Sequence, residues 1–510
     1  MVRPIESEIK LTASPKMLKK LRRHPKLAGA DQTATLITTY FDTIGARLRH
    51  GGATLRIRDD GKGREQTFKL VSPDKSSVRR GEWNVAAAGD LPEPSGFPVK
   101  ARTALTRLLD GATVEPIGTT RIDRTTRRLQ FGGSIIEIAF DLGTIRAGER
   151  EEAVCELEME LVEGKLADVL GLALHLPLGP ELSWSVSSKA EKCHLLAFDL
   201  PPAAVHSRPV KLSPDIDVAN GYQAIAWNCL DQLLANYPLV IASGDPESLH
   251  QSRVAIRRLR AADSLFGDVV DGEATPVLHA ELKAVAMGLG PVRDLHVLLV
   301  KVAAVARAGD HDVSELLAYL GTRRDAAMRS VQALLAAGPF QRLLFELAGW
   351  IENGEWLARK EETRGDQPLA PFAARVLSRR RRKLRRLRDQ LAEMPDAARH
   401  RLRIDVKKLR YAAEFVTSLY RGRATAKHSR TFAKALGQLQ DSLGEFNDIA
   451  VAAAGRNALF EDLEPIAAAR LAAQLKSLID DQVKSRRKLL KAAERSLVRI
   501  IGGPTWWKSK

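Results

Sequence analysis

The chain has 510 residues, more than one ordinary domain core holds, and its 45% hydrophobic content excludes a disordered protein. Its three cysteines, Cys155, Cys193 and Cys229, are too few and too widely spaced for a disulfide framework or a cysteine-based zinc site. The net charge is +17, and most of the basic excess follows residue 205, where 49 Lys and Arg stand against 35 Asp and Glu. This excess predicts a polyanionic partner (nucleic acid, an acidic membrane surface or polyphosphate), unless it only solvates a helical surface.

The N-terminal segment Met1–Lys10 carries charges where a signal peptide would be apolar. The sequence also lacks a run of about 18 apolar residues, the length that a membrane-spanning helix needs. We therefore expect no membrane association and a reducing, cytoplasmic setting.

Short alternating segments separated by Gly, Pro and Asp dominate the first 200 residues. The predicted strands are Ile5–Leu11, Thr54–Arg58, Thr67–Val71, Ile135–Asp141 and Val154–Leu161. The predicted helices in this part are Pro15–His24, Val99–Leu109 and Lys165–Leu174. A proline-rich stretch follows, and after about residue 215 long Ala/Leu/Arg segments with helical spacing take over. We predict a multi-domain protein with an N-terminal α+β domain (1–205), a linker (206–213) and an all-α domain (214–505).

One face of several predicted strands is charged, while the opposite face is apolar. Alternation alone leaves two interpretations open: a surface sheet with its polar face in solvent, or a barrel with a charged interior that binds metal ions and phosphate. Glu156, Glu158 and Glu160 share one strand, and Arg56 and Arg58 share another. This clustering favours the barrel, because like charges side by side repel each other and a ligand of opposite charge relieves the repulsion.

The segment Glu6–Lys10 resembles the ExExK signature of the CYTH family, also called triphosphate tunnel metalloenzymes. The resemblance runs over about the first 200 residues, in order. Its further elements are Tyr40–Thr43, Leu55–Arg58, Thr67–Lys69, Ile136–Glu137 with Asp141, Glu156–Glu160 and Ser188–Glu191. It implies an antiparallel barrel of eight strands that encloses a tunnel, with flanking helices, and a divalent-metal-dependent triphosphatase that uses Mg²⁺ or Mn²⁺.

The resemblance also implies roles for individual residues. The implied metal ligands are Glu6, Glu8, Glu156 and Glu158. The implied triphosphate-binding residues are Lys10, Arg56, Arg58, Lys69, Arg124 and Lys189. The implied catalytic residues are Glu6, Glu8, Lys10, Lys69 and Asp141. A ring of Lys and Arg would neutralise the substrate and stabilise charge on the departing phosphate.

The helical part contains an internal repeat, which indicates a duplicated bundle with halves at about 214–350 and 365–505. The offsets within the two basic stripes are identical, and each stripe falls on one helix face. The first stripe holds His250, Arg253, Arg257 and Arg260, and the second holds His400, Arg403, Lys407 and Arg410. Each is followed by a second shared element, which is Leu289–Gly290 with Arg293–Asp294 in one copy and Leu443–Gly444 with Asn447–Asp448 in the other.

This half resembles the CHAD domain over about residues 214–505, which implies that the stripe residues bind inorganic polyphosphate, with Arg258 and Lys408 as flanking candidates. The segment Arg379–Arg388 holds eight basic residues in ten positions and either extends that binding surface or is a solvated face. Few aromatic residues accompany the stripes, which argues against nucleic acid as the partner.

The function predicted from the sequence is hydrolysis of inorganic triphosphate combined with binding of inorganic polyphosphate. The alternative is a non-catalytic protein that binds or tethers polyphosphate and whose barrel senses triphosphate. The helical domain either delivers chain ends to the barrel or localises the protein to cytoplasmic polyphosphate granules.

Overall fold

The structure is a computed structural model that describes residues 6–71, 78–309, 312–387, 390–391, 393–454, 459–483 and 486–508. Ile5 and Arg388 lie outside this range, and so do the side chains of Asn447 and Asp448. The chain divides into two compact units. The first comprises Met1–Ser207, Trp227–Ser252 and Gln332–Gly354, and the second comprises Arg208–Ala226, Arg253–Val331 and Glu355–Lys510. The predicted domain boundaries at 205 and 214 stay predictions.

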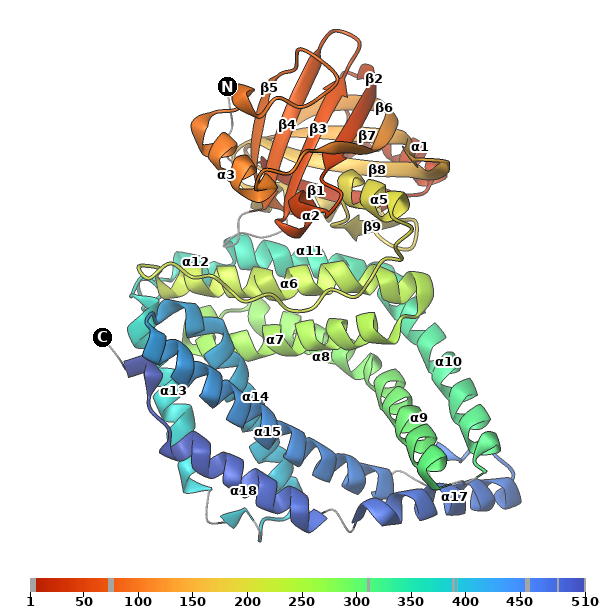
Figure 1. Cartoon of the computed structure of the whole chain (residues 1–510), viewed down its shortest axis with the longest axis vertical. Coiled ribbons are helices and arrows are strands. Elements are labelled where there is room, and N and C mark those ends of the chain that lie inside the picture. The colour runs from red at the N-terminus through yellow and green to blue at the C-terminus, as the bar shows by residue number, and fades with distance from the viewer. Residues whose placement is uncertain are drawn as a thin grey trace. The chain divides into compact units, whose positions relative to one another are not determined.

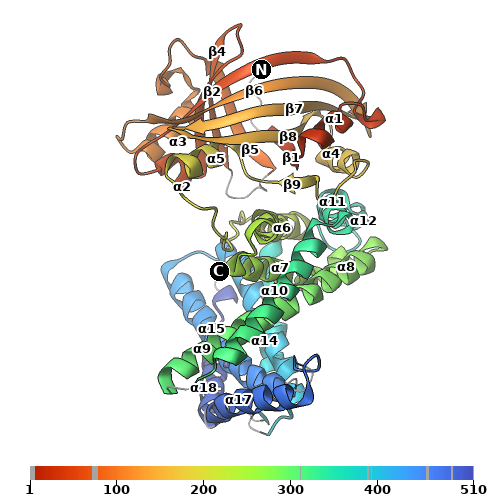
Figure 2. The same ribbon diagram turned by 90° about the vertical axis from the view of Figure 1, so that its right-hand side faces the viewer.

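The N-terminal part is an antiparallel barrel, as predicted (Figure 1). Its strands are β1 (Glu6–Ala13), β2 (Gln32–Asp42), β3 (Ala53–Asp59), β4 (Arg64–Val71), β5 (Arg79–Ala86), β6 (Glu115–Phe131), β7 (Ser134–Ala147), β8 (Arg150–Glu163) and β9 (Leu182–Ser185). The sheet order is β5-β4-β3-β2-β6-β7-β8-β1-β9, and β5 also pairs with β1. This extra pairing closes eight strands into a barrel, and β9 lies beside the second half of β1. The long strands β6, β7 and β8 curve around the barrel in Figure 2.

Helices cover the apolar outer face of the barrel. They are α1 (Pro15–Leu21), α2 (Arg47–His50), α3 (Val99–Leu109) and α4 (Leu166–Ala173), and a further helix, α5 (Lys189–Ala197), follows β9. Leu55, Ile57 and Phe68 of β3 and β4 pack with Ala101 and Leu105 of α3 in one buried cluster. Because side chains alternate along a strand, Arg56 and Arg58 point to the other side, into the barrel. The closed barrel therefore decides between the two interpretations of the alternation, in favour of a charged interior.

Helix α5 is an exception, because it packs against the interior face. Cys193 of α5 shares a buried cluster with Ile122, Ile145 and Val154. Ile122 and Val154 lie two residues from Arg124 and Glu156, on the same strand faces as those charged residues. Helix α5 therefore covers one end of the charged interior.

The C-terminal part is all-α, as predicted. Its helices are α6 (Val218–Ser243), α7 (Pro246–Val270), α8 (Ala274–Gly288), α9 (Gly290–Gly309), α10 (Ser314–Ala336), α11 (Gly338–Asn353), α12 (Glu355–Ala358), α13 (Leu369–Arg386), α14 (Asp396–Val416), α15 (Arg423–Ala454), α17 (Pro465–Val483) and α18 (Arg486–Gly502). In the second unit, α14 packs against α13 and α15, and α15 packs against α18. None of the described helices combines the length and the apolar character that crossing a membrane requires.

Candidate functional site

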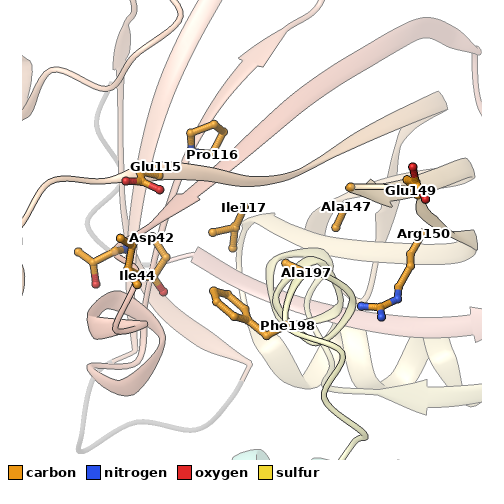
Figure 3. Close-up of a pocket in the computed structure, with 12 residues that line it drawn as sticks. Asp42, Ile44, Glu115, Pro116, Ile117, Ala147, Glu149, Arg150, Ala197 and Phe198 are labelled. Atoms are coloured by element: carbon orange, nitrogen blue, oxygen red, sulfur yellow. The ribbon is translucent and has the colours of Figure 1, made fainter.

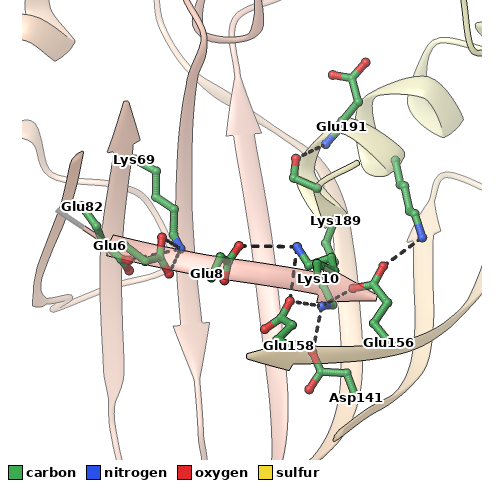
Figure 4. Close-up of polar contacts among 12 residues, drawn as sticks. Glu6, Glu8, Lys10, Lys69, Glu82, Asp141, Glu156, Glu158, Lys189 and Glu191 are labelled. Atoms are coloured by element: carbon green, nitrogen blue, oxygen red, sulfur yellow. Dashed lines mark hydrogen bonds and ion pairs between the residues drawn. The ribbon is translucent and has the colours of Figure 1, made fainter. Parts of the chain in front are cut away.

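The barrel interior brings most of the predicted tunnel residues together (Figure 4). Strands β1 and β8 run side by side, so that Glu8 lies opposite Glu160 and Lys10 lies opposite Glu158. On the other side of β8, Asp141 of β7 lies opposite Glu156. Two strand pairings thus concentrate acidic side chains on one wall of the barrel, as the charged strand faces predicted.

Lys189 occupies the centre of the first acidic group. Its Nζ lies 2.8 Å from Asp141, 2.7 Å from Glu156 and 2.8 Å from Glu158. Lys189 is the first residue of α5, whose N-cap Ser188 accepts a hydrogen bond from the backbone N–H of Glu191 at 3.1 Å. This cap fixes the start of the helix and therefore the position from which Lys189 reaches the carboxylates.

Arg124 of β6 neutralises the same group from the next strand. Its guanidinium donates to both carboxylate oxygens of Asp141, at 2.7 and 2.6 Å, and to Glu158 at 2.5 Å. Burial alone would raise the pKa of Glu158, but Lys189, Arg124 and Lys10 hold that pKa well below its usual range. The three carboxylates therefore stay ionised, and their oxygen atoms lie within 4.8 Å of one another.

A second acidic group lies nearer the start of β1 and has less positive charge around it. Lys69 of β4 donates to both oxygens of Glu6, at 2.8 and 2.7 Å, and lies 3.2 Å from Glu82 of β5. Burial and the charge of Glu8 raise the pKa of Glu6 to about 8. Burial and Glu8 likewise raise the pKa of Glu160 to about 7.

Raised carboxylate pKa values mean that this wall lacks the positive charge to keep all of its carboxylates ionised. Carboxylate oxygens are the ligands that Mg²⁺ and related divalent cations prefer. Glu6, Glu8 and Glu160 therefore offer the kind of oxygen donor that a divalent cation prefers. Among the described carboxylates, those of Asp141, Glu156 and Glu158 have oxygen atoms within 4.8 Å of one another, and the ammonium of Lys189 lies where these three converge.

The opposite wall carries arginines with few counter-ions. Arg58 of β3 donates to the hydroxyl of Thr38 at 3.3 Å, and the described residues form no ion pair with it. Burial, together with the charges of Arg56 and Arg124, lowers the pKa of Arg58 to about 10. The Nε atom of Arg56 is buried and has no hydrogen-bond partner among the described residues. The same holds for Nε of Arg80, which lies on β5 opposite Glu6 and so beside the acidic wall. Buried cations and unused N–H donors on one wall are suited to binding an anion.

Sequence reasoning missed two tunnel residues on β5, Arg80 and Glu82. Glu82 lies 3.2 Å from Lys69 and 3.8 Å from Arg56, so it connects the acidic and basic walls. The signal was present, because Arg80 and Glu82 alternate with Gly81 and Trp83, as on the recognised strands.

A surface pocket of about 540 Å³ lies apart from this interior (Figure 3). It is formed by the end of β2, the start of β6, the β7–β8 turn and the C-terminal end of α5. Its lining includes none of the predicted site residues. Asp42, its most buried carboxylate, accepts hydrogen bonds from the backbone N–H groups of Thr43, Leu48 and Arg49 and so stabilises α2.

The basic stripes lie on α7 and α14, as the repeat predicted. The Nε atoms of Arg253, Arg257 and Arg403 are buried, and no described residue accepts a hydrogen bond from them. Arg260 and His400 are exposed, and Arg410 donates to Gln440 at 3.1 Å. His250 precedes Arg253 on α7 but belongs to the first compact unit, and Lys407 is half-buried on α14.

Several neighbouring basic residues have structural contacts instead. Arg258 is fully buried, lies 3.2 Å from Glu414 and stacks over the ring of Phe415, so it cannot face a ligand. In the basic run on α13, Arg380 donates to the backbone carbonyls of Lys408 and Ser264 at 2.7 Å. Arg381 donates to carbonyls at the C-terminal end of α18. The exposed residues of this run are Arg379, Arg382, Lys383, Arg385 and Arg386.

Comparison with known proteins matches each half separately. Residues 4–192 match the family model of the CYTH domain, and residues 224–456 match that of the CHAD domain. An inorganic triphosphatase of Haemophilus influenzae is 30% identical over 194 residues, which cover 38% of this chain and 54% of that protein. The chain therefore spans about half the length of this curated relative.

Two solved structures are also similar. The crystal structure of the CHAD domain from the plant Ricinus communis is 29% identical, covers 59% of this chain and 99% of that chain, and has a TM-score of 0.51. A Hippeastrum protein described as having a dominant triphosphatase activity is 20% identical over 38% of this chain and 97% of that chain, with a TM-score of 0.26.

Proposed function

We propose that this chain, which consists of a CYTH domain followed by a CHAD domain, hydrolyses inorganic triphosphate to pyrophosphate and phosphate inside its barrel. The similarity to an inorganic triphosphatase supports this reaction. The main support for the proposal is that the guanidinium of Arg58 is buried and has no ion-pair partner among the described residues. A highly charged phosphate anion supplies the negative charge that this wall lacks.

Each wall of the barrel would have its own task. Arg58 would bind phosphate oxygens directly, because it has no ion-pair partner among the described residues. Arg56 would join it through its buried Nε donor, although its guanidinium also lies 3.8 Å from Glu82. Lys10, Lys69, Arg124 and Lys189 already hold carboxylates and would share their donors with the substrate. In the reaction, water oxygen bonds to the terminal phosphorus while the bridging P–O bond breaks, and these cations stabilise charge on the departing pyrophosphate.

Glu6, Glu8, Glu156 and Glu158 would hold the divalent cation, Mg²⁺ or Mn²⁺. Such an ion would supply positive charge to the phosphate groups and would lower the pKa of the attacking water. Glu160 lies opposite Glu8 and adds a further oxygen donor to this wall. Asp141 would act by fixing Arg124 and Lys189, since both cations bind its carboxylate.

Phosphate release from tripolyphosphate, measured with Mg²⁺, with Mn²⁺ and with EDTA, tests this proposal. We expect metal-dependent release that Glu6→Ala and Arg58→Ala each reduce by at least about 100-fold. Glu163→Ala, at the exposed end of β8, and Arg102→Ala, on the exposed face of α3, are the matched controls and should keep full activity. Equal release by Glu6→Ala and Glu163→Ala would rule out the assigned metal site.

For the helical domain, we propose binding of inorganic polyphosphate by the stripe residues of α7 and α14. The Nε atoms of Arg253, Arg257 and Arg403, which are buried and have no hydrogen-bond partner among the described residues, support this role. A buried donor without a hydrogen bond destabilises the protein, and an anionic ligand would supply the missing acceptor. The test is a titration with long-chain polyphosphate, DNA and RNA at matched ionic strength. Binding of all three with similar affinity would indicate only a general polyanion surface.

The alternative function is a barrel that binds triphosphate without cleaving it. It would be favoured by the absence of release with either metal in a protein that still binds polyphosphate tightly. The excess of carboxylates on one wall argues against this alternative. Buried acidic groups are costly to desolvate and repel an anion, so a protein that only binds triphosphate has no use for them.

A further inference from the structure

Two glycines lie at equivalent places in the two helical repeats. Gly290 is the first residue of α9, and Gly444 lies within α15, and a buried leucine precedes each of them. Neither glycine has a positive φ, so the backbone does not require glycine at either place. Glycine in the middle of a helix is destabilising relative to alanine, so Gly444 has no backbone advantage over alanine. The property that the two positions share is therefore the lack of a side chain.

The space next to each glycine is filled by the equivalent stripe arginine. A Cβ atom built on Gly290 would lie 3.4 Å from Nη1 of Arg253. A Cβ atom built on Gly444 would lie 3.7 Å from both Nε and Nη2 of Arg403. Arg253 and Arg403 occupy the same position in the two stripes, so the same packing occurs twice.

Two other helical glycines lack such a contact. A Cβ atom added to Gly437, seven residues before Gly444 on α15, would meet no described atom within 4 Å, and the same is true of Gly267 on α7. The contact with an arginine therefore distinguishes Gly290 and Gly444 from these two. Arg253 Nη1 also donates to the backbone carbonyl of Ala286 at 3.3 Å, which holds the guanidinium over the start of α9.

We infer that Gly290 and Gly444 are positioning residues, which seat the guanidinium groups of Arg253 and Arg403 against a helix backbone for polyphosphate binding. This inference rests on the proposed binding of polyphosphate. Both arginines also have a buried Nε donor for which the described residues provide no hydrogen-bond partner. An alanine Cβ would make ordinary van der Waals contact at these distances, whereas the branched side chain of valine would place methyl groups where the guanidinium lies.

The test measures the affinity of the full chain for long-chain polyphosphate at several salt concentrations. We expect Gly290→Val and Gly444→Val each to weaken binding roughly tenfold, the loss of one charge-assisted contact. The dependence of log K on log salt should become shallower by about 0.7, since one fewer counter-ion is released. Gly290→Ala and Gly444→Ala should bind nearly as tightly as the wild type, and Gly437→Val is the matched control for valine in a helix.

A double-mutant cycle distinguishes a displaced Arg253 guanidinium from a general loss of structure in the valine variant. If Gly290 acts through Arg253, Gly290→Val should weaken binding no further in an Arg253→Ala background. Additive losses, or wild-type affinity in Gly290→Val, would overturn the inference while leaving polyphosphate binding intact. A wild-type protein that does not bind polyphosphate would overturn the proposed binding function and this inference together.

Discussion

The ammonium of Lys189 is the group whose removal should disturb the barrel most. Lys189→Met keeps a chain of similar length but leaves Asp141, Glu156 and Glu158 without the cation that contacts all three at 2.7–2.8 Å. Removing one partner from a buried ion pair costs about 3–5 kcal/mol. For a domain of this size, each kcal/mol lowers the melting temperature by roughly 2–4 °C, so we expect a drop of about 6–20 °C.

Differential scanning calorimetry of the full chain measures this drop, with the barrel transition identified as the one that tripolyphosphate shifts upward. Mg²⁺ should restore part of the lost stability, because the three carboxylate oxygens lie within 4.8 Å of one another and can bind a cation in place of the ammonium. Lys192→Met is the matched control, since Lys192 contacts Glu156 at 3.0 Å and Glu152 at 3.9 Å, and it should cost only about 1 kcal/mol. Equal losses in the two variants would refute the reasoning.

The remaining predictions concern the effects of pH and of substitutions at other charged side chains. The raised pKa values of Glu160 (about 7) and Glu6 (about 8) mean that metal binding releases protons, so the apparent Mg²⁺ affinity measured by calorimetry should rise with pH up to about 8. Without metal the folded state holds the Glu6 proton that the unfolded state has lost, so stability to urea should fall as pH rises from about 4.5 to 8. Arg58→Ala should abolish phosphate release yet leave the melting temperature unchanged or higher, because it removes a buried charge without an ion-pair partner among the described residues; a large destabilisation would contradict this. Arg381→Ala should lower stability by about 2–3 kcal/mol through the carbonyls at the end of α18, with unchanged polyphosphate affinity.

Strand alternation was sufficient to predict the charged faces of β1, β3 and β8, because a period of two is a direct consequence of strand geometry. It does not report which face points inward, since a surface sheet and a barrel share the period. Only the pairing of β5 with β1, which joins residues far apart in the chain, makes the charged face an interior. Arg80 and Glu82 were missed for a related reason, because β5 has few apolar residues to mark it as a strand.

The repeat in the helical part predicted which residues are equivalent but not which ones face a ligand. Arg257 and Arg258 are neighbours in sequence, yet Arg258 turns inward to Glu414 and Phe415 while Arg257 keeps a buried Nε without a partner. A helix turns by about 100° per residue, so packing of the neighbouring helices decides between adjacent positions. The same holds for Arg380 and Arg381, whose backbone contacts have no signature in the basic run itself.

The two charged sites differ in how an anion can enter them. In the stripes, the Nε donors of Arg253 and Arg403 have no partner, so an anion displaces only solvent ions and binding should depend strongly on salt. In the barrel, the ammonium groups of Lys69 and Lys189 already hold carboxylates, so the proposed triphosphate would weaken those ion pairs and leave acidic oxygens without a cation. A divalent metal would supply that charge. Metal and triphosphate would then depend on each other, and by linkage each should raise the affinity of the other by the same factor. The inactive Arg58→Ala protein distinguishes two sources of this coupling. If Mg²⁺ and tripolyphosphate bind to it independently, the coupling depends on the arginine wall. If the coupling is retained, it depends on the lysine–carboxylate pairs.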